Sequence, residues 1–205
     1  MTSVFDKISE MPLIAILRGI RPGEVIEVCE ILSETGFRFV EVTTNSPEWQ
    51  KSIRLIKAHF GDNLVIGTGT VLTAQDVEQA VEAGSQVIIS PNFDADVVRL
   101  TKELGLISAP GCFTPSECFE ALKAGADILK IFPAEVLGQP FIKGVKAVLP
   151  EGTRICPTGG VTPENITDFQ KLGVFALGMG SALYSPGKSA QDLRTSAERF
   201  VSAMR

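Results

Sequence analysis

The stretch TPSECFEALKAGADILKIF, residues 114–132, carries the pattern that decides the fold. Thr114 precedes a proline and stands three residues before Glu117, which together indicate a capping box at the start of a helix. The helix-like segment ends at Gly125, because a residue without a Cβ suits the left-handed turn that closes a helix. An apolar run, 128–132, follows almost at once. The stretch therefore predicts a helix leading directly into a buried strand.

The same order, a helix-like segment closed by glycine and then an apolar run, recurs along nearly the whole chain. The closing glycines are Gly36, Gly61, Gly84, Gly105, Gly125, Gly152 and Gly173. The predicted strands are 13–17, 37–43, 64–70, 86–90, 106–109, 128–132, 154–157 and 174–178. Short apolar runs without clean alternation are typical of parallel strands that are buried on both faces.

Three further helix starts are visible. Ser46 and Thr162 each precede a proline and are predicted to cap a helix, and Thr73 with Asp76 forms a weaker capping box. Strand and helix thus alternate eight times, which predicts an α/β fold, a (β/α)₈ TIM barrel with a short N-terminal helix. A doubly wound open sheet is the alternative, although eight near-equal units favour closure. No linker interrupts the pattern, so we expect a single barrel domain over residues 1–205.

Composition limits the possible partners. The 205 residues carry a net charge of −5, which argues against nucleic acid as a partner because phosphate neutralisation needs a basic surface. No apolar stretch is long enough for a membrane span, and the first ten residues lack the apolar run of a secretory signal. The four cysteines show no paired spacing and His59 is the sole histidine, which argues against a zinc site. We therefore expect a cytoplasmic protein without membrane association.

The strand ends are where a barrel of this type places its active site. Glu41 is the single acidic residue among them, so a divalent metal site is not expected. The segment Gly67-Thr68-Gly69 lacks the third glycine of a dinucleotide fingerprint. We expect chemistry that needs neither a metal nor a cofactor.

Lys130 and Glu41 are unusual for their surroundings. Each stands inside an apolar strand, and by alternation Lys130 shares a face with Ile128 and Phe132, whereas Glu41 shares one with Phe37 and Phe39. Burial disfavours the charged form of a lysine and favours the neutral amine that attacks a carbonyl. A carboxylate beside it can move protons during such chemistry. The alternative is a structural ion pair at the barrel mouth, in which Glu41 merely neutralises Lys130.

The last two strand ends suggest an anion site. Thr158-Gly159-Gly160 leads toward a predicted helix start at Thr162, and Gly178-Met179-Gly180-Ser181 follows the eighth strand. Glycines let backbone N–H groups approach an anion, and barrels often bind phosphate with the loops after strands seven and eight.

With these residues in view, the sequence resembles the 2-keto-3-deoxy-6-phosphogluconate and 2-keto-3-deoxy-6-phosphogalactonate aldolases over essentially its whole length. The matching segments are Pro12–Arg18, Val40–Thr43, Gly67–Leu72, Leu129–Ala134 and Pro157–Val161. The resemblance implies a class I aldolase that cleaves a phosphorylated keto-deoxy sugar acid into pyruvate and glyceraldehyde 3-phosphate. It also implies a homotrimer.

The resemblance assigns roles to seven residues. Lys130 would form a Schiff base with the C2 ketone, and Glu41 would shuttle protons, first through water at the carbinolamine and then at the enamine. Thr70 would hold the substrate carboxylate, and Arg18 would bind the anionic substrate. Gly160, Gly180 and Ser181 would receive the phosphate.

The two branches of the family differ in stereochemistry at C4 of the substrate, and this chain is mixed. Thr44–Trp49 and Ser90–Asn92 resemble the galactonate branch, since the gluconate branch typically has an arginine where Asn45 stands. In contrast, Phe132–Glu135 and Pro157–Gly160 resemble the gluconate branch. The phosphogalactonate substrate is favoured. Two other functions stay open from the residues alone: another phosphate-binding barrel enzyme, such as an epimerase or isomerase, and a non-catalytic sugar-phosphate-binding protein.

Overall fold

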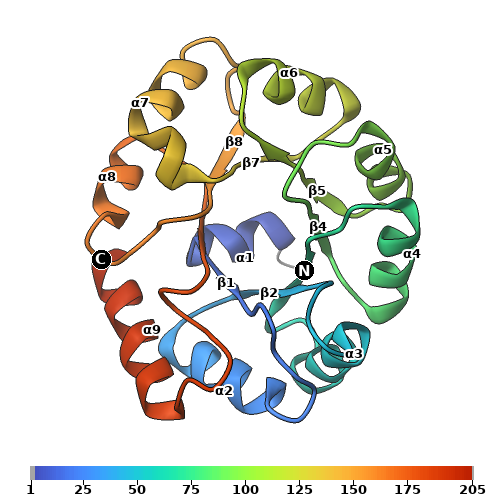
Figure 1. The fold of residues 1–205 in the computed structure, drawn as a ribbon, viewed down its shortest axis with the longest axis vertical. Coiled ribbons are helices and arrows are strands. Elements are labelled where there is room, and N and C mark those ends of the chain that lie inside the picture. The colour runs from blue at the N-terminus through green and yellow to red at the C-terminus, as the bar shows by residue number, and fades with distance from the viewer. Residues whose placement is uncertain (1–2, 205) are drawn as a thin grey trace.

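The computed structural model describes residues 3–204. The strands are β1 (Leu13–Ile16), β2 (Phe39–Thr43), β3 (Val65–Gly69), β4 (Val87–Ile89), β5 (Ile107–Ala109), β6 (Gly111–Cys112), β7 (Ile128–Ile131), β8 (Arg154–Pro157) and β9 (Leu177–Met179). The helices are α1 (Val4–Glu10), α2 (Val25–Thr35), α3 (Trp49–Phe60), α4 (Ala74–Ala83), α5 (Ala95–Glu103), α6 (Pro115–Ala124), α7 (Ala134–Lys146), α8 (Ile166–Lys171) and α9 (Ala190–Met204). Strands and helices alternate, and helices α2–α9 form a ring outside the strands (Figure 1).

All strand pairs are parallel. The strands form one sheet in the order β5-β4-β3-β2-β1-β9 and another in the order β6-β7-β8. Backbone contacts connect the two sheets at both seams: the Asp127 N–H donates to the Ser108 carbonyl over 2.9 Å, and Thr158 forms an isolated bridge with Gly178. These contacts complete the ring, which confirms the predicted (β/α)₈ barrel.

The predicted strand at 106–109 is longer in the structure and is divided into two parts. It continues beyond Pro110 as β6, so that β5 pairs with β4 while β6 pairs with β7. Proline has no N–H with which to continue a ladder, so the strand is divided into two short parts at this residue.

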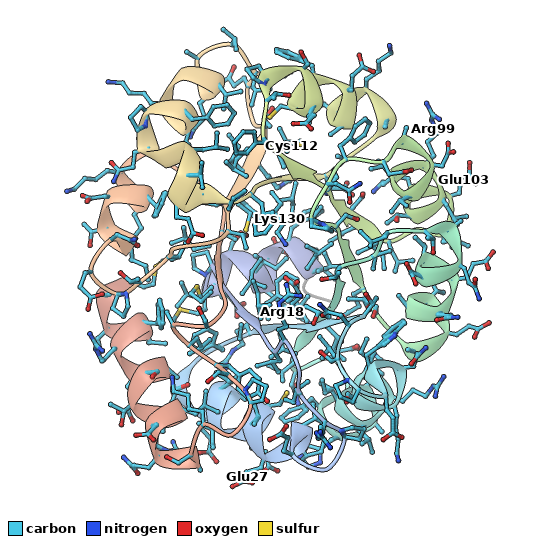
Figure 2. The ribbon with its side chains drawn as sticks, in the orientation of Figure 1. Arg18, Glu27, Arg99, Glu103, Cys112 and Lys130 are labelled. Atoms are coloured by element: carbon cyan, nitrogen blue, oxygen red, sulfur yellow. The ribbon has the colours of Figure 1, made fainter. Side chains whose placement is uncertain are left out.

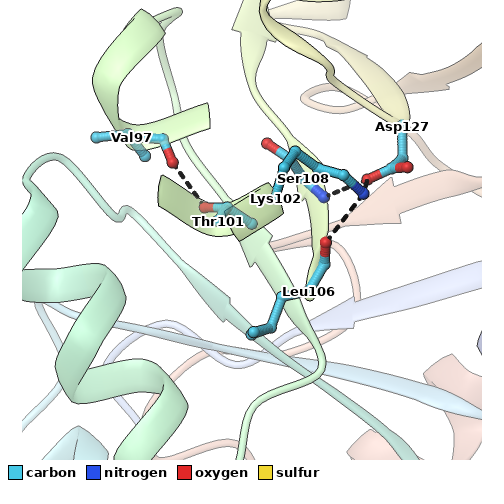
Figure 3. Close-up of polar contacts among 6 residues, drawn as sticks. All are labelled: Val97, Thr101, Lys102, Leu106, Ser108 and Asp127. Carbon is cyan, nitrogen blue, oxygen red and sulfur yellow. Dashed lines mark hydrogen bonds and ion pairs between the residues drawn. The ribbon is translucent and has the colours of Figure 1, made fainter. Parts of the chain in front are cut away.

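A polar cluster stabilises the seam between β5 and β7 (Figure 3). Lys102, at the end of α5, donates to the Asp127 carboxylate over 2.6 Å and to the Leu106 carbonyl over 3.1 Å. The same Asp127 oxygen accepts the Ser108 N–H over 2.8 Å. The cluster therefore satisfies backbone groups at the strand starts, at the end of the barrel opposite to the site described below.

The predicted N-terminal helix is confirmed as α1, which crosses one end of the barrel (Figure 1). Its Ile8 is fully buried and packs with inward-facing strand residues such as Ile14, Phe39 and Ile128. Burying apolar surface in this way closes the bottom of the barrel and leaves the other end for chemistry. No helix among residues 3–204 is both long and apolar enough to cross a membrane.

Both predicted capping boxes are confirmed, because Thr73 with Asp76 and Thr114 with Glu117 make the reciprocal hydrogen bonds. The predicted caps at Ser46 and Thr162 are wrong. The Ser46 hydroxyl instead accepts the Gly19 N–H over 2.8 Å, and α3 begins at Trp49. Helix α8 begins at Ile166, four residues after Thr162. In both places the proline opens a turn, and contacts within the loops override the helix-start signal.

Candidate active site

Lys130 lies on β7 and faces the barrel interior. Its neighbour Ile128 belongs to the interior apolar cluster, whereas Leu129 and Ile131 pack against the outer helices. The lysine is 6% exposed, and its Nζ lies 5.1 Å from the centroid of the Phe132 ring. The amine therefore stands in largely apolar surroundings at the mouth of the barrel.

Glu41 lies on β2, faces the same interior and is 2% exposed. Burial raises the pKa of its carboxyl group above the usual range, although the positive charges of Lys130 and Arg18 act in the opposite direction. Its Oε1 atom accepts no hydrogen bond from the residues that the structure describes. Buried polar atoms almost always have a partner, so an unpaired carboxylate oxygen indicates a group that is built to interact with a bound molecule.

One sequence expectation about this face is wrong. Phe39 packs inside the barrel with Glu41, but Phe37 packs on the outside, in the cluster between strands and helices. The Phe37 N–H donates to the Leu32 carbonyl over 2.9 Å, so Phe37 belongs to the turn that ends α2. Alternation across the strand begins only where the backbone is extended, at Phe39.

Gly69, at the end of β3, provides the space that the Glu41 carboxylate occupies. A Cβ added to Gly69 would lie 1.9 Å from Glu41 Oε1 and 2.6 Å from its Cδ. No side chain fits there without displacing the carboxylate. The sequence motif around Gly69 contained this residue, but nothing in the one-dimensional pattern indicated that it faces Glu41.

Replacing Gly69 by alanine is expected to lower kcat about 100-fold, because moving a catalytic group by about 1 Å has an effect of that order. Steady-state turnover of the substrate proposed below measures the change. Gly23→Ala is a matched control, since nothing lies within 4 Å of a Cβ at that position. Wild-type turnover in Gly69→Ala would show that the Glu41 position is not critical.

Two cavities meet at Lys130 and Thr158. A small one inside the barrel is lined by Glu41, Cys156 and apolar residues as well as by these two. A larger one, of about 610 Å³, lies at the C-terminal ends of the strands. Its lining includes Arg18, Gly160, Gly180 and Ser181. Figure 2 shows Arg18 and Lys130 inside the ring of strands, whereas Glu27, Arg99 and Glu103 lie on the outer rim.

The glycine loops line the part of this cavity away from Glu41. Gly159 and Gly160 have φ values of 96° and 69°, and the Gly160 carbonyl accepts a hydrogen bond from Asn165 over 2.7 Å. Nothing lies within 4 Å of a Cβ built on Gly180. Backbone N–H groups can thus approach a bound anion. Because α8 begins only at Ile166, the anion site depends on the loops and not on a helix start at Thr162.

Arg18 and Thr70 lie at the side of the site nearest β1 and β3. An Arg18 Nη1 donates to Asn45 Oδ1 over 3.0 Å and lies 3.5 Å from Thr70 Oγ1, at the outer limit for a hydrogen bond. Thr70 lines neither cavity and reaches the site through Arg18. It also has a left-handed backbone, with a φ of 59°.

Sequence reasoning missed the surroundings of these residues. Thr158 was recognised as a strand end, but its place between both cavities was not predicted. Cys156 lines the small cavity, and burial raises the pKa of its thiol to about 12, which keeps it protonated near neutral pH. Phe132, Glu135 and Tyr184 also line the larger cavity. Strand alternation predicts that Phe132 shares a face with Lys130, but the sequence gives no signal for Glu135 or Tyr184.

The site therefore combines a buried amine, a nearby carboxyl group with a raised pKa and glycine loops at the mouth of a (β/α)₈ barrel. A family model described as KDPG and KHG aldolase matches residues 4–195. The 2-dehydro-3-deoxy-6-phosphogalactonate aldolase of Escherichia coli (strain K12) is 42% identical over 197 residues, which cover 96% of this chain and 96% of that protein. The chain belongs to the KDPG and KHG aldolase family, and aldolases are carbon–carbon lyases.

Solved structures agree with this assignment. A native KDPGal structure superposes with a TM-score of 0.93 at 42% identity and covers 95% of each chain. KDPG aldolase from Legionella pneumophila, solved with pyruvate captured at low pH as a covalent carbinolamine intermediate, has a TM-score of 0.86 at 27% identity. That comparison covers 96% of this chain and 97% of the other.

Proposed function

We propose that this protein is a class I aldolase that cleaves 2-dehydro-3-deoxy-6-phosphogalactonate into pyruvate and glyceraldehyde 3-phosphate. The observation that carries the proposal is the pair of buried groups, Lys130 and Glu41, on the inner face of one barrel mouth. A buried amine is a carbonyl nucleophile, and a carboxyl group with a raised pKa can give and take protons near neutrality.

In the first half of the reaction, the Lys130 amine attacks the C2 ketone and gives a carbinolamine. Glu41, acting through water, moves the protons that allow water to leave and a protonated imine to form. Glu41 and Lys130 both line the small cavity, which supports this proton transfer. The imine nitrogen is then the electron sink for the next step.

In the second half, Glu41, acting through water, takes the proton of the C4 hydroxyl, and the C3–C4 bond breaks. Its electron pair passes to the imine, which leaves an enamine on Lys130 and releases glyceraldehyde 3-phosphate. Glu41 protonates C3 of the enamine, and water then hydrolyses the new imine to release pyruvate and the free amine. The carboxylate thus works twice, as acid and as base.

The two ends of the substrate are assigned to different groups of the site. Arg18 and Thr70 bind the carboxylate end of the substrate, because a guanidinium with a nearby hydroxyl suits a carboxylate. Gly160, Gly180 and Ser181 bind the phosphate through backbone N–H groups and a hydroxyl. Arg18, Lys130 and the glycine loops all line this one cavity, which supports the assignment.

The preferred C4 configuration is that of the galactonate. The resemblance of Thr44–Trp49 to that branch supports it, as does the 42% identity to the Escherichia coli enzyme. The decisive experiment is pyruvate release from the two C4-epimeric substrates, measured side by side. We expect a higher kcat/KM for the galactonate epimer, and a higher value for the gluconate epimer would contradict the assignment.

We further propose a homotrimer in the cytoplasm. Large apolar side chains are exposed near the barrel mouth and on α6, among them Leu72, Phe113 and Phe119, and such surface is typical of subunit interfaces. All four cysteines are free, as is usual in a reducing compartment. A light-scattering mass three times that of the chain tests the trimer, and a monomer mass would exclude it.

A further inference from the structure

Thr70 has a backbone conformation that its residue type rarely adopts. Its φ is 59°, in the left-handed region, where a β-branched side chain is a genuine outlier. Such a conformation persists only where surrounding contacts hold it, and it is common at functional sites. The contacts that hold Thr70 therefore bear on how the proposed carboxylate site is built.

Thr44, on the loop after β2, provides these contacts. Its hydroxyl donates to the Thr70 carbonyl over 2.6 Å, and its N–H donates to the Gly69 carbonyl over 2.9 Å. Two successive carbonyls at the end of β3 are thus bound to one residue. Beyond Thr70, the Val71 N–H donates to the Ile89 carbonyl over 3.1 Å, so the segment is fixed on both sides.

The next residue, Asn45, makes a hydrogen bond to Arg18, the residue proposed to bind the substrate carboxylate together with Thr70. Its Oδ1 accepts the hydrogen bond from Arg18 Nη1 over 3.0 Å. Arg18 is exposed and makes no ion pair with the residues that the structure describes. A long exposed arginine has many rotamers, so a fixed acceptor reduces the freedom that substrate binding must remove.

We propose that Thr44 is a positioning residue for substrate binding: its hydroxyl holds Thr70 in the left-handed conformation, while Asn45 beside it orients Arg18. The pair Thr44-Asn45 thereby presents the Thr70 hydroxyl and the Arg18 guanidinium to the same end of the substrate. Among the described residues, neither makes a hydrogen bond to Lys130 or to Gly159, Gly160 or Gly180, so we expect their effect to be on binding of the carboxylate end. The inference rests on the proposed aldolase function.

The test compares Thr44→Val, which keeps the shape but loses the hydroxyl, with Thr44→Ser, which keeps the hydroxyl. The readout is the pyruvate concentration that gives half-maximal trapping on the protein in the presence of borohydride. We expect Thr44→Val to raise this concentration about tenfold, the effect of one lost hydrogen bond, and Thr44→Ser to restore most of it. The inhibition constant of inorganic phosphate, measured on cleavage of the phosphorylated substrate, is expected to stay unchanged in both variants.

Asn45→Ala gives a second variant at an exposed position, where loss of folding is not a concern, and it is expected to weaken pyruvate binding in the same way. Unchanged half-saturation in Thr44→Val and Asn45→Ala would overturn the inference. So would an equal loss of phosphate binding, or a Thr44→Ser variant as weak as Thr44→Val. Absence of trapping in the wild-type protein would instead overturn the proposed function.

Discussion

Lys130→Arg is expected to lower pyruvate release about 10⁴-fold or more, because loss of the nucleophile removes the covalent pathway. Arginine keeps the positive charge at the site, but its guanidinium does not lose a proton and cannot form the imine. A coupled assay that follows pyruvate with the galactonate epimer measures the effect. The change in kcat is expected to exceed by far any change in KM.

Lys123→Arg is a suitable control for the lysine exchange, since Lys123 lies on α6 with a 78% exposed side chain. Its turnover is expected to match that of the wild type. If Lys130→Arg retained measurable turnover, Lys130 would be an electrostatic partner. Cleavage would then not pass through an imine on this lysine.

Glu41→Gln is expected to lower kcat about 10²- to 10⁴-fold, the range for loss of a general acid–base group. The amide keeps the size of the side chain and therefore its fit against Gly69, but it cannot transfer a proton. Steady-state kinetics measure the decrease in kcat. Borohydride trapping of pyruvate is expected to become slower but to remain on Lys130. Turnover within a few fold of wild type would show that another group moves the protons.

The same exchange has a pH-dependent effect on stability. Burial raises the pKa of Glu41 in the folded protein, so the folded state keeps this proton at pH values where the unfolded chain has lost it. Wild-type stability from this group is therefore highest at low pH and declines as pH rises toward the folded pKa. Denaturant unfolding across this range is expected to favour Glu41→Gln increasingly as pH rises, and the opposite trend would contradict the buried-carboxyl interpretation.

Much of the fold was predictable because local chemistry determines it. Glycines such as Gly84 and Gly125 close helices in the left-handed conformation, and the strands begin within a few residues of them. Alternation along the strand containing Lys130 predicts that the lysine shares a face with Ile128, and the structure shows that this face is the barrel interior. At Ser46 and Thr162 the same reasoning failed, because loop contacts from other segments decide where a helix starts.

The fine geometry of the site could not be predicted because it depends on residues that are distant in sequence. The space that Gly69 leaves for Glu41 depends on contact between strands β3 and β2, and the hydrogen bond from Thr44 to Thr70 joins the loops that follow these strands. The left-handed backbone of Thr70 runs against the preference of its residue type. Local propensity predicts the common conformation of a residue type. It cannot predict a rare conformation that neighbouring residues impose.

The central claim is that Lys130 forms an imine with a keto acid. Incubating the protein with pyruvate and borohydride, followed by digestion and mass spectrometry, tests it directly. The account predicts one irreversible adduct per chain, on the peptide that contains Lys130. A folded protein that takes up no pyruvate, or that is labelled on another lysine while Lys130 stays free, would contradict it.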